Sequence, residues 1–221
     1  MARIILTLVG PWDKPPVFET PFELKPGGHD PSIIDDFRAL AAETEGLDAA
    51  ELKAVGEHRS TVVADRVFEG PGRLEAAGDA ARLMKAAFAA GATGIRVETG
   101  LKVFGPSIAR EIDPKAPELL LHLLVEVLID DEAVGTEGMQ AFDLPDIVVP
   151  YSDEQDAAPA QAAAFALAAK MVVDRFAPVH GGVFRASESA PLYAVSRVEP
   201  ADGEAQPFDN ARGSWRLDRK G

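Results

Sequence analysis

Four histidines and one strongly acidic stretch carry the side chains that could perform acid–base or metal chemistry in this sequence. The histidines are His29, His58, His122 and His180. No two of them have the H-x-x-x-H or H-x-H spacing that brings imidazoles onto one zinc ion, and the chain has no cysteine. The sequence therefore predicts no metal site and no thiol chemistry.

Two histidines have neighbours that suit general acid–base catalysis. His180 precedes Gly181 and Gly182, and glycines allow a close approach of backbone or ligand. His122 and Glu126 share one face if their segment is a strand, but roughly 13 Å would separate them at ~3.3 Å per residue. His180, His122 and Glu126 are the candidates for a catalytic His–carboxylate site.

The acidic stretch runs from Asp130 to Asp156 and holds nine carboxylates without any Lys, Arg or His. The whole chain has 22 basic and 36 acidic side chains, a formal net charge of −14. The spacing lacks the alternating pattern of a calcium loop. We expect an exposed acidic face here, and solvated turns without a partner are the alternative. The binding residues assigned to this face are Asp130, Asp131, Glu132, Glu137, Asp143 and Asp146.

Composition and missing motifs exclude several function classes. A surface of this charge repels phosphate backbones and anionic lipids, so nucleic-acid binding and membrane docking are not expected. No apolar run reaches the ~18 residues of a spanning helix, and the first apolar run is too short for a signal peptide. Nucleophile-elbow, P-loop and dinucleotide-binding motifs are absent. We predict a cytoplasmic protein of bacterial type without a cofactor.

Hydrophobic periodicity predicts mixed strands and helices. The expected strands are 4–9, 60–68, 119–129, 139–149 and 191–198, and the expected helices are 31–46, 48–55, 74–90 and 157–173. Residues 94–103 are expected to form a strand, or a hairpin that turns at Gly100. Residues 11–30 are expected to form an irregular loop, and residues 130–138 a turn. In residues 119–129 the alternation of apolar side chains favours a strand, and a helix remains the alternative.

This order lacks the strict alternation of a doubly wound sheet, so it favours the α+β class. We predict a sandwich with a mostly antiparallel sheet and helices packed mainly on one face. No linker-like segment interrupts residues 1–198, which we assign to a single domain. Residues 199–221 are polar and predict a loop-like C-terminal tail.

One segment resembles a known family. Residues 135–147 (GTEGMQAFDLPDI) resemble a motif of an uncharacterised bacterial family, domain of unknown function 4261. Residues 86–97 and 162–198 are similar to that family in their order of helix, glycine and strand. The resemblance spans roughly residues 60 to 198. It implies one α+β domain, and it implies no activity, cofactor or catalytic residue.

Together these observations favour a protein-binding function over catalysis. We expect an adaptor-like or immunity-like protein whose acidic face recognises a basic protein, because opposite charges steer partners together. Two alternatives remain open. One is an enzyme that acts on a small molecule through a His–carboxylate site, and the other is a structural subunit of a homo-oligomer.

Overall fold

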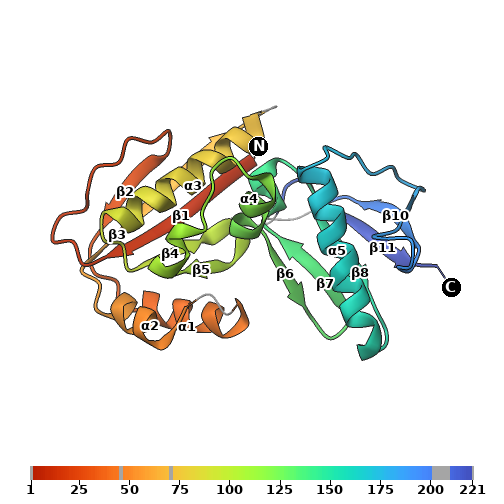
Figure 1. Cartoon of the computed structure of the whole chain (residues 1–221), viewed down its shortest axis with the longest axis horizontal. Helices are drawn as coiled ribbons and strands as arrows, with labels where there is room; N and C mark the ends of the chain where they lie inside the picture. The colour runs from red at the N-terminus through yellow and green to blue at the C-terminus, as the bar shows by residue number, and fades with distance from the viewer. Residues whose placement is uncertain (1, 45–46, 70–71, 201–209, 221) are drawn as a thin grey trace.

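The fold is built on two β-sheets that lie side by side (Figure 1). The structure is a computed structural model that describes residues 2–44, 47–69, 72–200 and 210–220. All strand pairs but one are antiparallel among the described residues. The predicted α+β class is therefore confirmed. The division of the strands into two sheets was not predicted.

The first sheet has five strands in the order β2-β3-β1-β4-β5. Its strands are β1 (Ala2–Gly10), β2 (Glu23–Gly27), β3 (Ser60–Phe68), β4 (Gly94–Val97) and β5 (Lys102–Phe104). The central β1 is β-branched and apolar, and Ile4, Leu6 and Leu8 are completely buried on one of its faces. β2 lies in the region predicted to be an irregular loop, so that prediction is wrong for residues 23–27.

Helices cover both faces of this first sheet. α3 (Arg73–Ala89) packs over β1, and Gly91 follows it with a φ of +86° that suits the end of a helix. α1 (Ile33–Thr44) and α2 (Ala49–Gly56) pack in a smaller cluster with Val9 and Val103. These three helices confirm the sequence-based expectations, although the expected end of the first one, at residue 46, lies outside the described residues.

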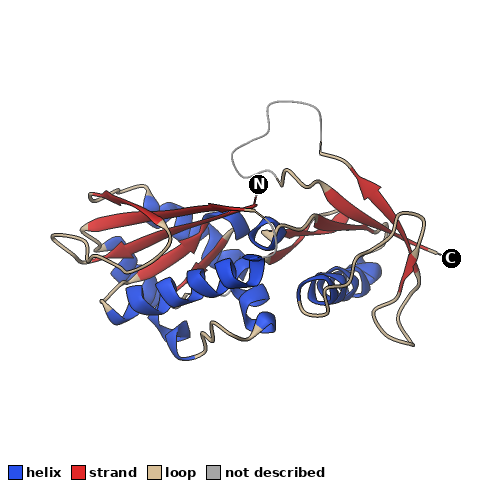
Figure 2. Ribbon diagram, turned by 90° about the horizontal axis from the view of Figure 1, so that it is seen from above, coloured by secondary structure: helices blue, strands red, loops and turns tan. Residues whose placement is uncertain are grey.

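The second sheet has six strands in the order β6-β7-β8-β11-β10-β9. Its strands are β6 (Glu126–Ile129), β7 (Ala133–Glu137), β8 (Asp146–Pro150), β9 (Val183–Phe184), β10 (Tyr193–Val198) and β11 (Ser214–Arg219). α5 (Ala157–Val172) packs on it and lies on the same side of the strands as α3 (Figure 2). Small side chains let α5 approach the sheet closely; the buried ones are Ala160, Ala163, Ala164 and Ala168.

The prediction of a continuous strand over residues 119–129 is wrong. Residues Pro117–Leu124 form α4, and only Glu126–Ile129 form a strand. Pro117 occupies the first turn of the helix, where a missing N–H costs nothing. The leucines at 120, 121, 123 and 124 are all buried, because α4 packs between α3 and α5. The alternation over residues 119–129 fits a strand, but the leucines also recur three and four positions apart, as in a helix, so tertiary packing decided between the two.

The C-terminal segment is also more ordered than predicted. β11 lies between β8 and β10, parallel to the first and antiparallel to the second. Leu217 is completely buried, while its strand neighbours Arg216 and Asp218 form an ion pair at the surface. The prediction of a loop-like tail is therefore wrong for residues 214–219. Residues 201–209 and 221 of that segment lie outside the described residues.

Two further predictions around the acidic stretch need correction. Residues 130–138 contain β7 as well as a turn, and residues 139–149 begin with a 3-10 turn before β8. The 3-10 turns are η2 (Glu98–Gly100), η3 (Pro106–Arg110), η4 (Met139–Phe142) and η5 (Glu154–Asp156). The backbone changes direction at Gly138, which has a φ of +108°.

The two sheets meet where three backbone segments come unusually close. A Cβ atom at Gly138 would lie 2.2 Å from the carbonyl oxygen of Leu124 and 2.9 Å from the Cα of Gly100. A Cβ atom at Gly100 would also lie 2.2 Å from the Leu124 oxygen. Glycine at both positions therefore lets η2, η4 and the end of α4 touch. The main buried cluster includes residues from both sheets around this point.

Substitution at this junction should destabilise the fold. We expect Gly138→Ala to lower the free energy of unfolding by about 3 kcal/mol or more, because a left-handed φ and a backbone clash act together. Gly91→Ala is the matched control, since its φ is +86° but nothing lies within 4 Å of a new Cβ. That variant should lose only about 1 kcal/mol. Urea unfolding measures both, and equal losses would contradict the close contact.

Candidate functional site

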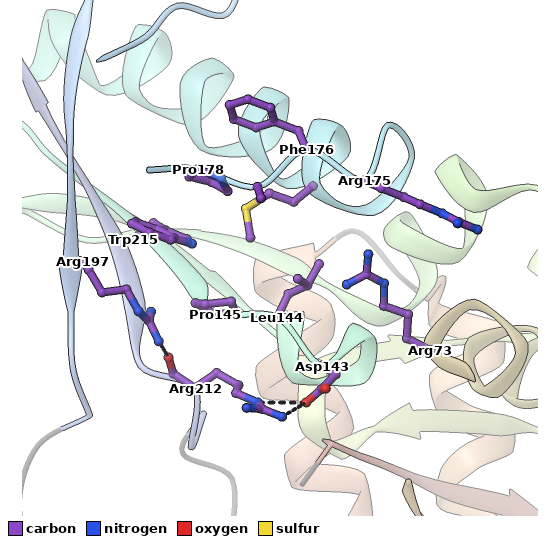
Figure 3. Close-up of a pocket in the computed structure, with 12 residues that line it drawn as sticks. Arg73, Asp143, Leu144, Pro145, Arg175, Phe176, Pro178, Arg197, Arg212 and Trp215 are labelled. Carbon is purple, nitrogen blue, oxygen red and sulfur yellow. Dashed lines mark hydrogen bonds and ion pairs between the residues drawn. The ribbon is translucent and has the colours of Figure 1, made fainter. Parts of the chain in front are cut away.

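A cavity of about 370 Å³ opens beside the end of α5, where β10, β11 and the loop after η4 converge (Figure 3). Four of its twelve lining residues are arginines, and the single acidic one is Asp143. The arginines are Arg73, Arg175, Arg197 and Arg212. We call this cavity the arginine pocket. It concentrates positive charge in a chain whose formal net charge is −14.

The middle of the arginine pocket is apolar. Leu144, Met171 and Trp215 line it together with two prolines (Figure 3). Met171 is buried at the end of α5, while Trp215 is half-buried on β11. A cavity with apolar walls and charged groups at its rim is the usual form of a small-molecule site.

Two of the arginines are held in place by neighbouring groups. Arg212 donates to Oδ1 of Asp143 through Nε at 2.9 Å and contacts it through Nη2 at 2.7 Å. The guanidinium of Arg197 lies 5.3 Å from the ring centre of Trp215 and donates to the carbonyl oxygens of Ser214 and Arg212. This arrangement fixes one wall of the pocket and neutralises part of its charge.

The other two arginines are less constrained. Within the described residues, neither Arg73 nor Arg175 forms an ion pair with a carboxylate. Arg73 is the first residue of α3 and extends towards the middle of the pocket, whereas the Arg175 guanidinium points away from Trp215 (Figure 3). Arg175 follows α5 with a left-handed φ of +56°, which costs free energy for a residue other than glycine.

A buried carboxylate supports the wall that carries Leu144 and Arg212. Oδ1 of Asp146 accepts hydrogen bonds from the Thr136 hydroxyl at 3.0 Å and the Met139 N–H at 3.2 Å. Oδ2 of Asp146 accepts from the Asn210 amide at 2.6 Å. Burial raises the pKa of Asp146 to about 6, and these three hydrogen bonds oppose the rise.

Asn210 carries this support to the pocket. Its side-chain amide donates to the Leu144 carbonyl oxygen at 2.9 Å, and its side-chain oxygen accepts from the Arg212 N–H at 2.9 Å. Leu144 and Arg212 both line the pocket. Asp146 and Asn210 therefore position pocket residues without lining the pocket themselves.

The acidic residues predicted to form one exposed face do not all lie on it. Asp130, Asp131 and Glu132 are exposed at the turn between β6 and β7. Glu137 and Asp143 are half-buried, and Asp143 is paired with an arginine. Asp146 is buried, so its assignment to an exposed face is wrong. The counter-ion of Asp143 comes from Arg212, and another acid of the stretch, at position 156, pairs with Arg219. Both arginines lie in the segment that was predicted to be a tail.

The histidine candidates do not hydrogen-bond to described carboxylates, although the charge of Glu126 acts on His122 and partly opposes the lowering of its pKa. Glu126 lies 3.1 Å from the Nζ of Lys102, which also donates to the Val125 carbonyl oxygen. The ring of His122 packs 4.9 Å from that of Phe165, and partial burial followed by the charge of Lys102 lowers the pKa of His122. His180 is exposed and accepts a hydrogen bond from a backbone N–H at 3.1 Å. Within the described residues, neither histidine bonds to a carboxylate.

The remaining two histidines have a structural role. Nε2 of His58 accepts from the Asp30 N–H at 3.1 Å, so Nδ1 carries the proton that it donates to the Val55 carbonyl oxygen at 2.8 Å. His29 stacks against His58 with 4.5 Å between ring centres. In the part of the chain that the structure describes, no three His, Asp or Glu side chains gather in a group that could hold a metal ion.

The arginine pocket could not be predicted from the sequence. Its arginines are separated by up to 139 positions, and no local motif joins Arg73 to Arg212. Arg212 and Trp215, close together in an acidic chain, were the available signal. These two residues reach the pocket only because β11 pairs with β8.

Comparisons with known proteins add no relative. A scan against protein-family models found no match, and searches among curated proteins and solved structures found none either. The resemblance to domain of unknown function 4261 therefore stays a prediction. Among the described helices, none is long and apolar enough to cross a membrane.

The buried carboxylate gives the fold a distinctive pH dependence. Because the folded-state pKa of Asp146 is about 6 and its ordinary value is 3.8, the folded state holds this proton more tightly. The contribution to stability is complete below about pH 4 and is lost as the pH rises through about 6. It amounts to about 3 kcal/mol.

Asp146→Asn removes that titration. The wild-type protein and Asp146→Asn are unfolded with urea at pH values from about 4 to above 6. The free energy of unfolding of the wild-type protein, relative to that of the variant, should fall as the pH rises. Thr136→Val is the control, because it removes one hydrogen bond to the carboxylate and keeps the titrating group. If the difference in the free energy of unfolding between the wild-type protein and Asp146→Asn stays constant with pH, the raised pKa of Asp146 is contradicted.

Proposed function

We propose that the arginine pocket binds a small organic anion, and that the chain acts as a binding module for a ligand with a phosphate or carboxylate group. The observation that carries this proposal is the gathering of four arginines around one apolar cavity in an acidic protein. Guanidinium groups bind phosphate and carboxylate through paired, charge-assisted hydrogen bonds. The volume of about 370 Å³ falls within the range of small-ligand sites.

The charged part of the ligand is assigned to Arg73 and Arg175. Their guanidinium groups have no carboxylate partner within the described residues, whereas Arg212 already pairs with Asp143. Arg73 also stands at the amino-terminal end of α3, where the helix dipole favours negative charge. Arg175 has to turn inward from the orientation in Figure 3, and an anion between the two side chains would then gain charge-assisted bonds without breaking an ion pair among the described residues.

The lining favours binding over turnover. Among the described residues that form the pocket there is no Ser, Thr, Tyr, His or Lys, and the single acid is held by Arg212. The pocket thus supplies groups that hold an anion and apolar groups that hold the rest of a molecule. It supplies no nucleophile and no free general base for a reaction.

Binding can be measured through the pocket's own tryptophan. The chain has two tryptophans, and Trp12→Phe leaves Trp215 as the single reporter. Phenyl phosphate is the probe, because it joins a dianion to a small apolar ring. We expect saturable quenching of Trp215, and we expect Arg73→Gln in this background to weaken binding about tenfold, the loss of one charge-assisted hydrogen bond.

Controls separate site binding from general attraction. Arg38→Gln removes the same charge from α1, far from the pocket, and should leave the dissociation constant unchanged. Phenol should bind much more weakly than phenyl phosphate because it lacks the anion. Equal binding by Arg73→Gln and the parent, or no saturable quenching, would overturn the proposal.

A protein partner at the acidic turn is the second candidate function. Asp130, Asp131 and Glu132 are consecutive and exposed, and none pairs with a described Lys or Arg. Unpaired carboxylates at one turn favour a basic partner through charge complementarity. Neutralising all three should remove salt-sensitive binding of basic peptides, and unchanged binding would contradict this role.

A further inference from the structure

We propose that the open edge of β6, together with the neighbouring face of α5, forms a groove that binds an extended basic peptide as a seventh strand. This inference rests on the second proposed function, the basic partner at the acidic turn, and specifies how that partner binds. It concerns a different part of the molecule from the arginine pocket. Addition of a strand to a sheet edge is a recurring mode of peptide recognition.

β6 offers hydrogen-bonding groups along its free side. It is the terminal strand of the six-stranded sheet and pairs only with β7 in the described part of the chain. The Asp130 N–H donates to the Ala133 carbonyl oxygen at 2.9 Å, so residues 130, 128 and 126 direct their backbone groups towards β7. The alternate residues, Val127 and Ile129, therefore direct their backbone N–H and C=O groups away from β7, towards the open edge. The Val127 N–H is already bonded to its neighbour's side chain, which leaves the Ile129 N–H and two carbonyl groups for a partner.

Two hollows follow one another along this strand. One, of about 290 Å³, lies between Val127 and the α5 residues Ala158, Ala162 and Phe165. The other, of about 460 Å³, lies between Ile129, the acidic turn and the start of α5. The α5 residues that line them recur one helical turn apart, so they form one face of the helix. We call these two hollows together the β6 groove. Its floor of alanines leaves room for the side chains of an added strand.

Charge sets the chemistry and direction of the occupant. The acidic turn with Asp130 and Asp131 closes the groove at the end of β6 and lines the larger hollow. A strand that pairs antiparallel to β6, the more stable arrangement, begins at that end. The expected peptide thus has Lys or Arg at its amino-terminal positions, followed by apolar side chains at alternate positions that face α5.

The same charges disfavour a second copy of this chain in the groove. Antiparallel pairing of two β6 strands would bring Glu126 of one copy beside the acidic turn of the other, and the nearby Lys102 is already paired with Glu126, so it is not available to that turn. Like charges directly opposite each other destabilise a strand pair. A basic segment from another protein meets no such repulsion.

The test is selection followed by a direct structural readout. The full-length protein is used to select from a displayed library of random heptapeptides, and one enriched peptide is synthesised. We expect enriched sequences to show amino-terminal Lys or Arg and alternating apolar positions. In amide hydrogen exchange followed by NMR, the synthetic peptide should slow the exchange of the Ile129 N–H at least tenfold.

Matched variants separate strand addition from charge attraction. Ile129→Pro removes the outward N–H and keeps the bonds to β7, since proline is tolerated at that side of an edge strand. Ile129→Pro should weaken binding of the peptide at least tenfold. Asp130→Asn combined with Asp131→Asn should also weaken binding of the peptide and make that binding less sensitive to salt. The charge control is Glu23→Gln with Asp35→Asn, two exposed acids on β2 and α1, which should change nothing.

Each outcome decides a different claim. If the acidic-turn variant weakens binding but Ile129 is not protected and Ile129→Pro binds normally, strand addition is overturned and the basic partner stands. If no peptide is enriched, or enriched peptides ignore both variants, both claims fail. If the free protein is a dimer with Ile129 already protected, a second copy occupies the groove and the proposal is overturned.

Discussion

The close approach of Gly100, Gly138 and the Leu124 carbonyl oxygen is the constraint on which the rest of this structure depends. Three backbone segments meet there so closely that a Cβ atom at Gly100 or Gly138 would clash with the Leu124 carbonyl oxygen. The contact joins the end of α4 to the turns η2 and η4, one from each sheet. Both sheets share one buried cluster, and this contact fixes the turn at Gly138 from which η4 and β8 follow. The residues that follow, from η4 to β8, supply one wall of the arginine pocket.

Hydrogen bonds to a buried carboxylate hold that wall of the pocket in place. Asp146 ties β7, η4 and Asn210 together, and Asn210 in turn holds Leu144 and Arg212 at the pocket. A buried carboxylate is costly unless its acceptors are used, and here both oxygens accept hydrogen bonds. The acid that sequence analysis assigned to a docking face is thus a support for a cationic site. Opposite charges occupy separate places: arginines surround the pocket, and unpaired acids mark the turn beside β6.

Sequence patterns predicted the local elements with clear periods and failed where distant segments decide. The alanine-rich helices and the β-branched strands β1 and β3 appeared where expected, since propensity and pattern agree there. The leucine run of α4 fits both a strand period and a helix period, so packing between two helices determined its form. β11 looked like a polar tail because only Leu217 and half-buried Trp215 face inwards, and its place between β8 and β10 is not encoded locally. The arginine pocket depends on that strand, so it was invisible for the same reason. The glycine at 138 was recognisable as a turn residue, but its contact with Leu124 was not.

A crystal structure of the protein grown with phenyl phosphate tests the central claim most directly, because it locates the anion. We expect the phosphate within about 3 Å of the Arg73 guanidinium, with Arg175 turned towards it and the ring against Leu144 and Trp215. The same crystals should show Arg212 still paired with Asp143. Phenyl phosphate bound only at another surface, or an empty pocket at a concentration that saturates binding in solution, would contradict the assignment of the arginine pocket as the ligand site.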